Sequence, residues 1–143
     1  MILPDTNLLL YAFRNEFPEH GKARRWLDGL ASDRGLLALH PLTVAAFLRL
    51  ATRRLGPLPP APSATALAFV VGLEQRGIWL TETTDHTRLM GRLLQRHQIS
   101  GDGIPDAWLA ALAITQGLTL ASHDQGFARF APELQWLDPL APA

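Results

Sequence analysis

The 143-residue chain contains no cysteine, which excludes disulfide bonds and thiolate metal sites. It also has no excess charge of either sign, because 13 basic residues balance 13 acidic ones. The total charge therefore provides no general attraction to nucleic acid, and any basic surface must be local. No apolar run approaches the roughly 20 residues of a membrane-spanning helix, and the first residues do not form a secretion signal. We therefore expect a cytoplasmic protein that does not contact membranes.

Apolar residues make up 48% of the chain, which is enough for one hydrophobic core, so we expect a single domain over residues 1–143. Short strand-like runs alternate with longer helical ones, the pattern of a parallel sheet covered by helices. The expected strands are residues 1–4, 36–39, 78–80, 118–121 and 134–137. The expected helices are residues 7–13, 18–30, 41–54, 63–75, 84–97 and 105–116.

Three aspartates lie where these elements end or begin. Asp5 follows the first strand, Asp106 lies in the first turn of a helix, and Asp124 follows the fourth strand. If the strands are parallel, the three carboxylates meet at the carboxyl edge of the sheet. Their mutual repulsion would be relieved by Mg²⁺ or Mn²⁺, which prefer oxygen ligands. Such an ion activates water for attack on phosphorus, so the pattern indicates phosphodiester hydrolysis.

Neighbouring polar residues have both an ordinary and a functional interpretation. Any one of the three acids alone is more often a helix cap or a turn residue than a ligand. Asn7 either caps the first helix or orients a carboxylate, and Ser122 either forms a turn or donates a hydrogen bond across the site. Asp102 stands between two glycines and is interpreted as a turn residue.

Four segments, taken in order and spacing, are similar to the PIN-domain ribonucleases and more narrowly to the VapC toxins of bacterial toxin–antitoxin pairs. They are residues 5–7 (Asp-Thr-Asn), 47–52 (Phe-Leu-Arg-Leu-Ala-Thr), 105–113 (beginning Pro-Asp-Ala-Trp) and 122–127 (Ser-His-Asp-Gln-Gly-Phe). The resemblance extends over essentially the whole chain. It implies a three-layer α/β/α sandwich around a parallel sheet of about four to five strands.

The resemblance also implies an activity and partners. Asp5, Asp106 and Asp124 match the metal-binding acids of the family, so Mg²⁺- or Mn²⁺-dependent cleavage of RNA is expected. A cognate antitoxin is expected to hold the enzyme inactive by placing a helix over it and a basic side chain among the acids. A homodimer is expected as well.

Two positions depart from the family pattern. The usual acid before the Phe-Leu-Arg segment is Ala46 here, and a further aspartate often found before the final phenylalanine is Gly126. Fewer carboxylates weaken metal binding, so the alternative is a degenerate PIN domain that binds RNA or a protein without cleaving. A phosphatase of the HAD type is a weaker alternative, because Asn7 occupies the position of its second aspartate and Lys22 is the only lysine.

Surface contacts are predicted from local side chains. Arg49 belongs to the family-like segment and is expected to contact RNA phosphate or to support the acids. The remaining arginines near it or on the first two helices are interpreted as solvated: Arg14, Arg24, Arg25, Arg53 and Arg54. Four apolar side chains near helix ends could be covered by the antitoxin or a second subunit: Trp26, Leu30, Leu55 and Leu58. Of these, Trp26 is expected in the core rather than at an interface.

Overall fold

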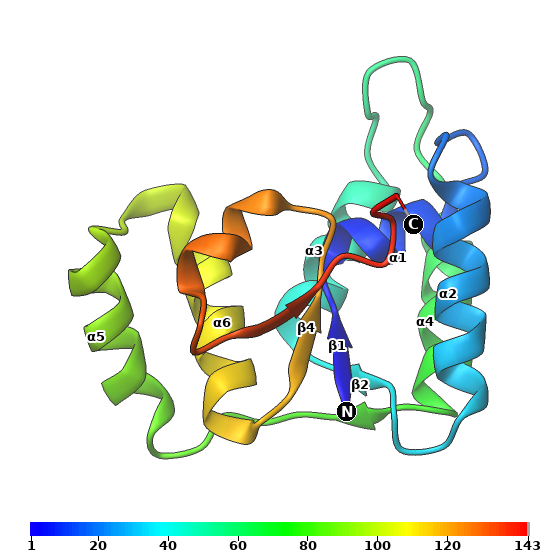
Figure 1. Cartoon of the computed structure of the whole chain (residues 1–143). Helices are drawn as coiled ribbons and strands as arrows, with labels where there is room; N and C mark the ends of the chain where they lie inside the picture. Colours follow the sequence, from blue (N-terminus) through cyan, green and yellow to red (C-terminus); the bar gives the residue numbers. More distant parts are fainter. Residues whose placement is uncertain (143) are drawn as a thin grey trace.

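Strands and helices alternate along the chain in a computed structural model that describes residues 1–142 (Figure 1). The first half contains β1 (Ile2–Pro4), α1 (Thr6–Phe13), α2 (His20–Ser32), β2 (Ala38–Leu39), α3 (Pro41–Ala51) and α4 (Ser63–Glu74). The second half contains β3 (Ile78–Trp79), α5 (His86–His97), η1 (Gly101–Gly103), α6 (Ile104–Gln116), β4 (Thr119–Ala121), η2 (Gln125–Phe130) and β5 (Gln135–Leu137). None of the helices in this described part is long and apolar enough to cross a membrane.

All strand pairs are parallel, as predicted. One sheet has the order β1-β4-β5, and β2 pairs with β3 in a second sheet. A parallel bridge between Ile2 and Leu37 places β2 beside β1, and the Ile2 amide donates to the Leu36 carbonyl at 2.7 Å. Since β2 and β3 have only two residues each, the predicted single sheet is divided into a three-stranded and a two-stranded part. The strands after β1 continue to one side as β2 and β3 and to the other side as β4 and β5, so the order in which the sequence adds strands reverses between β1 and β4. α/β proteins place their binding sites at such a reversal.

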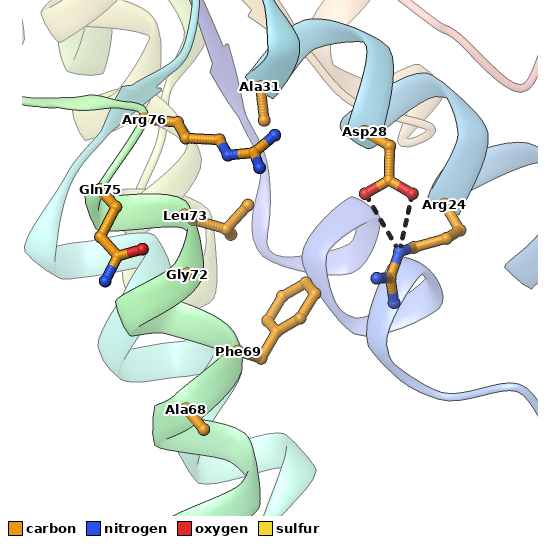
Figure 2. Close-up of a pocket in the computed structure, with 9 residues that line it drawn as sticks. All are labelled: Arg24, Asp28, Ala31, Ala68, Phe69, Gly72, Leu73, Gln75 and Arg76. Carbon is orange, nitrogen blue, oxygen red and sulfur yellow. Dashed lines mark hydrogen bonds and ion pairs between the residues drawn. The ribbon is translucent and has the colours of Figure 1, made fainter.

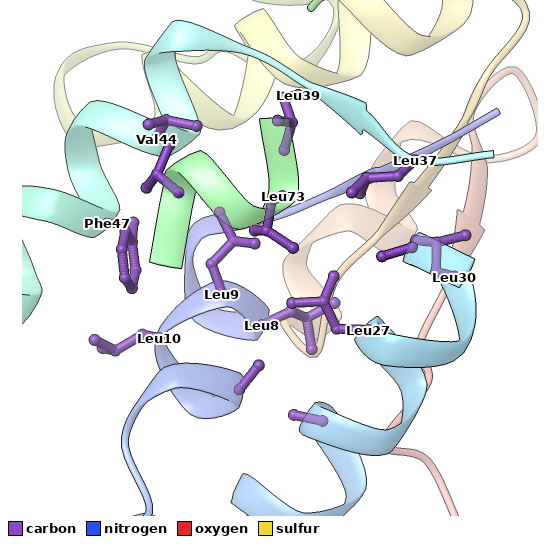
Figure 3. Packing of buried hydrophobic residues seen from close by; sticks show 14 of the residues in the cluster. Leu8, Leu9, Leu10, Leu27, Leu30, Leu37, Leu39, Val44, Phe47 and Leu73 are labelled. Carbon is purple, nitrogen blue, oxygen red and sulfur yellow. The ribbon is translucent and has the colours of Figure 1, made fainter. Parts of the chain in front are cut away.

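Helices cover both faces of the strands, which confirms the predicted sandwich (Figure 1). On one side, α1, α2, α3 and α4 enclose a core that includes Leu9, Leu27 and Phe47 (Figure 3). On the other side, α5 and α6 pack over Leu3 and Leu120. Successive strand residues enter opposite cores, because side chains alternate along a strand.

Some element boundaries differ from those predicted. α2 begins at His20 rather than at Pro18, because residues 17–20 form a turn in which the His20 amide donates to the Phe17 carbonyl at 3.1 Å. α3 ends at Ala51, before the loop that contains Gly56. α5 begins two residues later than predicted. The 3₁₀ helix η2 was not predicted, because its six residues are too few to show the periodicity by which a longer helix is recognised.

Candidate active site

The three predicted acids line one cavity of about 510 Å³ at the carboxyl end of β1 and β4. Its wall also includes Asn7, a predicted supporting residue, and Arg49, the predicted RNA-binding residue, both of which are exposed. The other residues that line it are Thr6, Leu42, Thr43, Ala45, Ala46, Leu50, Pro105 and Leu109. The fold thus brings together side chains from both ends of the sequence.

Asp5 is held by its own neighbours at the end of β1. One carboxylate oxygen accepts a hydrogen bond from the Thr6 amide at 2.7 Å, so Asp5 caps α1. The other accepts from the Ser122 hydroxyl at 2.8 Å. The Ser122 oxygen in turn accepts from the Asp124 amide at 3.0 Å, and Ser122 is completely buried. A single buried hydroxyl therefore links the loops that follow β1 and β4.

Asp124 caps the 3₁₀ helix η2. Its Oδ1 accepts from the Gly126 amide at 2.8 Å. A Cβ atom added at Gly126 would lie 3.0 Å from the same Oδ1, closer than most such contacts. A larger residue at Gly126 would require the Asp124 carboxylate to shift by a few tenths of an ångström.

Asp106 enters the cavity from the first turn of α6, directly after Pro105. Burial, and then the charges of Asp5 and Asp124, raise the pKa of Asp106 to about 6, while Arg129 lowers it. Burial also raises the pKa of Asp5, although the hydrogen bonds from Ser122 and Thr6 oppose this change and Asp124 adds to it. Asp5 and Asp124 therefore lie close enough to Asp106 to affect its ionisation, and a cation between the acids would relieve the repulsion.

The donor atoms are of the kind that Mg²⁺ and Mn²⁺ prefer, but they are not arranged around a common point. Within residues 1–142, no three His, Cys, Asp or Glu side chains form a group that could hold a metal ion. The Asp5 carboxylate accepts from the Thr6 amide and from the Ser122 hydroxyl of the loop that follows β4, and the Asp124 carboxylate accepts from the Gly126 amide. Like charges this close repel each other, and a cation bound among them would offset that repulsion.

The wall formed by α3 is largely apolar. Ala46, at the position of the family's fourth acid, lines the cavity without supplying a carboxylate. Arg49 lies one turn further along the helix and makes no ion pair within the described residues. Its guanidinium is thus a cation at the rim of an acidic cavity.

Sequence reasoning missed a hydrogen-bond network next to this wall, which runs from buried His40 to exposed Glu82. His40 follows β2, and its Nδ1 accepts from the Leu42 amide at 3.1 Å, which caps α3. With Nδ1 as acceptor, Nε2 carries the proton and donates to Glu82 Oε1 at 2.5 Å. Trp108, two residues after Asp106, donates its indole N–H to the same oxygen at 2.8 Å. The network joins α3 to α6, and its only sequence signal is a histidine directly before a helix-starting proline.

A second missed contact supports the loop between Ser122 and Asp124. His123 Nδ1 lies 3.0 Å from each carboxylate oxygen of Asp138, which follows β5. Gln125 also donates to Asp138, at 3.0 Å. The end of β5 thereby holds the loop that presents Asp124.

Two surface predictions were wrong. Arg14 is only 6% exposed and donates to the Pro59 carbonyl at 2.8 Å, so it holds the proline-rich loop instead of facing solvent. Leu30 is also 6% exposed and belongs to the core, so it is not available to a partner. Trp26, Leu55 and Leu58 are partly buried.

The exposed apolar side chains lie mainly on α4 and the edge strand β3: Leu67, Val71, Ile78 and Trp79. A separate cavity of about 340 Å³ lies between α2 and α4, where Arg24 pairs with Asp28 at 3.0 Å beside Phe69 (Figure 2). Asp28 is the single carboxylate among the residues that line this cavity, so it does not resemble the site with three acids.

Comparisons with known proteins agree with this architecture. The family model for the PIN domain matches residues 2–132. Ribonuclease VapC31 of Mycobacterium tuberculosis is 39% identical over 133 residues, which are 92% of this chain and 94% of that protein. The solved structure of VapBC2 from Rickettsia felis, bound to a promoter DNA fragment, matches with a TM-score of 0.68 and 21% identity over 95% of this chain and 97% of that chain. The structure of Mycobacterium tuberculosis VapC20, described as a sarcin–ricin loop cleaving toxin, matches with a TM-score of 0.68 and 20% identity over 92% of this chain and 95% of that chain.

Proposed function

The chain belongs to the PIN-domain family, and we propose that it is a metal-dependent endoribonuclease that acts as the toxin of a type II toxin–antitoxin system. The observation that supports this most strongly is the convergence of Asp5, Asp106 and Asp124 on one cavity. Relatives named as VapC ribonucleases extend over nearly the whole chain, which favours the same reaction on RNA.

The proposed reaction assigns a separate task to each residue. Asp5, Asp106 and Asp124 would hold one Mg²⁺ or Mn²⁺, with Asp106 in its ionised form. When bound, such an ion supplies an activated water and stabilises charge on the phosphate. Ser122 fixes the rotamer of Asp5 through its 2.8 Å hydrogen bond and also fixes the backbone at Asp124. Asn7, on the cavity wall, would orient an acid or a metal-bound water.

Arg49 would bind the RNA backbone at the rim of the cavity. A guanidinium without an ion pair can donate to a phosphate in a bidentate manner, and it offsets the repulsion between RNA and the three acids. Because net charge is zero, such local cations must provide the electrostatic attraction to RNA.

A cognate antitoxin would be the protein partner. Its basic side chain among the acids would neutralise the cavity and prevent metal binding. Its apolar helix face would cover Leu67 and Val71, which are 51% and 41% exposed and lie four residues apart on α4. A homodimer is the further proposed assembly, and sedimentation equilibrium of the isolated chain tests it.

One observation favours a second function. Ala46 supplies no fourth carboxylate, and the acids are not grouped around a common point within residues 1–142. A degenerate domain that binds RNA or a partner without cleaving it would have these features.

Cleavage of total RNA by the purified protein distinguishes the two functions. The proposed enzyme cuts RNA with Mg²⁺ or Mn²⁺, does not cut in EDTA, and loses activity in Asp5→Ala, Asp106→Ala and Asp124→Ala. Asp102→Ala, an exposed acid of η1, is the matched control and should retain activity. Folded protein that cuts under none of these conditions would instead support the degenerate domain.

A further inference from the structure

Arg129 extends from the end of η2 toward the N-terminal end of α6. Its Cζ atom lies 4.9 Å from the centroid of the Phe130 ring, so the guanidinium rests on that ring. Its Nη2 atom lies 3.6 Å from the point that a Cβ on Gly103 would occupy. Gly103 directly precedes α6, which holds Asp106 in its first turn. The geometry therefore places a cation beside the helix end that supplies one of the three acids.

This position does not benefit the helix itself. The N-terminal end of a helix carries partial positive charge and is stabilised by anions, so a nearby arginine is unfavourable there by itself. Arg129 also makes no ion pair within the described residues, unlike Arg24 with Asp28 and Arg96 with Glu133. An anionic ligand at this end of α6 would satisfy the guanidinium and the helix together.

We propose that Arg129 binds a phosphate of the RNA substrate on the α6 side of the three-acid cavity. This inference rests on the proposed ribonuclease function and extends it. Arg49 comes from α3 and Arg129 from η2, so the two guanidinium groups contact different phosphates of one strand. The η2 segment that follows Asp124 is then part of the substrate surface as well as the support for that acid.

Salt dependence of RNA binding tests the proposal. A fluorescent single-stranded RNA is titrated with wild type, Arg129→Ala, Arg129→Lys and Arg92→Ala in EDTA over a series of KCl concentrations. Arg92 is the matched control, because it is exposed on α5 beside Ile114, far along α6 from Asp106. Loss of one phosphate contact reduces the slope of log Kd against log salt by about 0.7 for single-stranded nucleic acid. If binding without metal is too weak to measure, the slope of KM in Mg²⁺ is used instead.

The expected result is a smaller slope in Arg129→Ala and wild-type slopes in Arg129→Lys and Arg92→Ala. A lower Tm in Arg129→Ala with an unchanged slope would overturn the proposal and leave only a structural contact with Phe130. Cleavage by the wild type is measured in the same series. If the wild type neither binds nor cuts RNA, the proposed function is contradicted. If the wild type cuts RNA but Arg129→Ala and Arg92→Ala have the same salt slope, only the assignment of Arg129 is contradicted.

Discussion

At the scale of single residues, Ser122 connects two of the three acids. Its hydroxyl donates to Asp5 and accepts from the Asp124 amide, and no solvent reaches it. Groups that orient metal ligands in this way typically contribute about 10- to 100-fold to activity or metal affinity.

We expect Ser122→Ala to reduce RNA cleavage by about 10- to 100-fold, because Asp5 loses a donor that fixes its rotamer. Ser32→Ala, which removes an exposed hydroxyl bonded only within α2, is the control and should have wild-type activity. Cleavage rates over a range of Mn²⁺ concentrations provide the measurement. Equal metal dependence in wild type and Ser122→Ala would show that the hydroxyl does not support the site.

Asp106 should make the folded protein less stable at neutral pH. Its pKa in the folded state is about 6, above the ordinary 3.8, so the folded state holds the proton more tightly than the unfolded chain. The free energy of unfolding therefore falls as pH rises from about 4 to about 6. Above that range the whole loss of stability caused by ionised Asp106 remains. In EDTA, Asp106→Asn should raise the Tm at pH 7.5 and leave it nearly unchanged at pH 4.

Thermal melts of wild type, Asp106→Asn and the control Asp102→Asn provide this comparison. Cleavage by the wild type should increase as pH rises through about 6, because only the ionised Asp106 binds a cation. If the Tm of Asp106→Asn differed from that of the wild type by the same amount at pH 4 and pH 7.5, ionisation of Asp106 would not be the cause of the difference.

Sequence position predicted that the three acids lie together, because each follows a strand or begins a helix at the same edge of a parallel sheet, and all three line one cavity. Arg129 could not be found in this way, since its contact with the start of α6 depends on how η2 packs. Arg14 was misinterpreted for a similar reason, because its partner, the Pro59 carbonyl, is 45 residues away in the sequence.

At the scale of elements, the network of His40, Glu82 and Trp108 fixes α3 relative to α6, the two helices that form opposite parts of the cavity lining. Helix periodicity and proline positions predicted the existence of both helices. They could not predict this connection, because Glu82 lies in a loop and its two partners are 42 and 26 residues away.

We expect His40→Ala to lower the free energy of unfolding by about 1–2 kcal/mol, because α3 loses its cap. His40→Asn should recover part of the loss, since asparagine also caps helices. Urea denaturation of both variants, with exposed Thr84→Ala as control, measures the effect. Equal stability of His40→Ala and wild type would contradict a structural role of the network.

At the scale of the whole molecule, α4 packs one face into the core of the α1–α4 side through Ala66, Val70 and Leu73 and leaves Leu67 and Val71 exposed. This helix is apolar on most of its surface, which is unusual for a helix in contact with solvent. Its exposed side therefore suits a protein partner.

Introducing charge on this side should affect inhibition without affecting catalysis. We expect Leu67→Glu combined with Val71→Glu to weaken inhibition by the cognate antitoxin at least about tenfold, because each buried carboxylate adds a desolvation cost. Leu137→Glu changes a similarly exposed leucine on β5 and serves as the matched control. Cleavage assays with increasing antitoxin give the inhibition constants. Equal constants for all variants would place the antitoxin elsewhere.

The most direct test of the three-acid site is the binding of Mn²⁺ followed by electron paramagnetic resonance. The three acids line one cavity, and the proposed ion would be held by all three. Wild type and the control Asp102→Asn should bind one Mn²⁺ with equal affinity, whereas Asp5→Asn, Asp106→Asn and Asp124→Asn should each bind it at least about tenfold more weakly. Absence of Mn²⁺ binding in the wild type, or unchanged binding in Asp106→Asn, would contradict the assignment of these acids as a metal site.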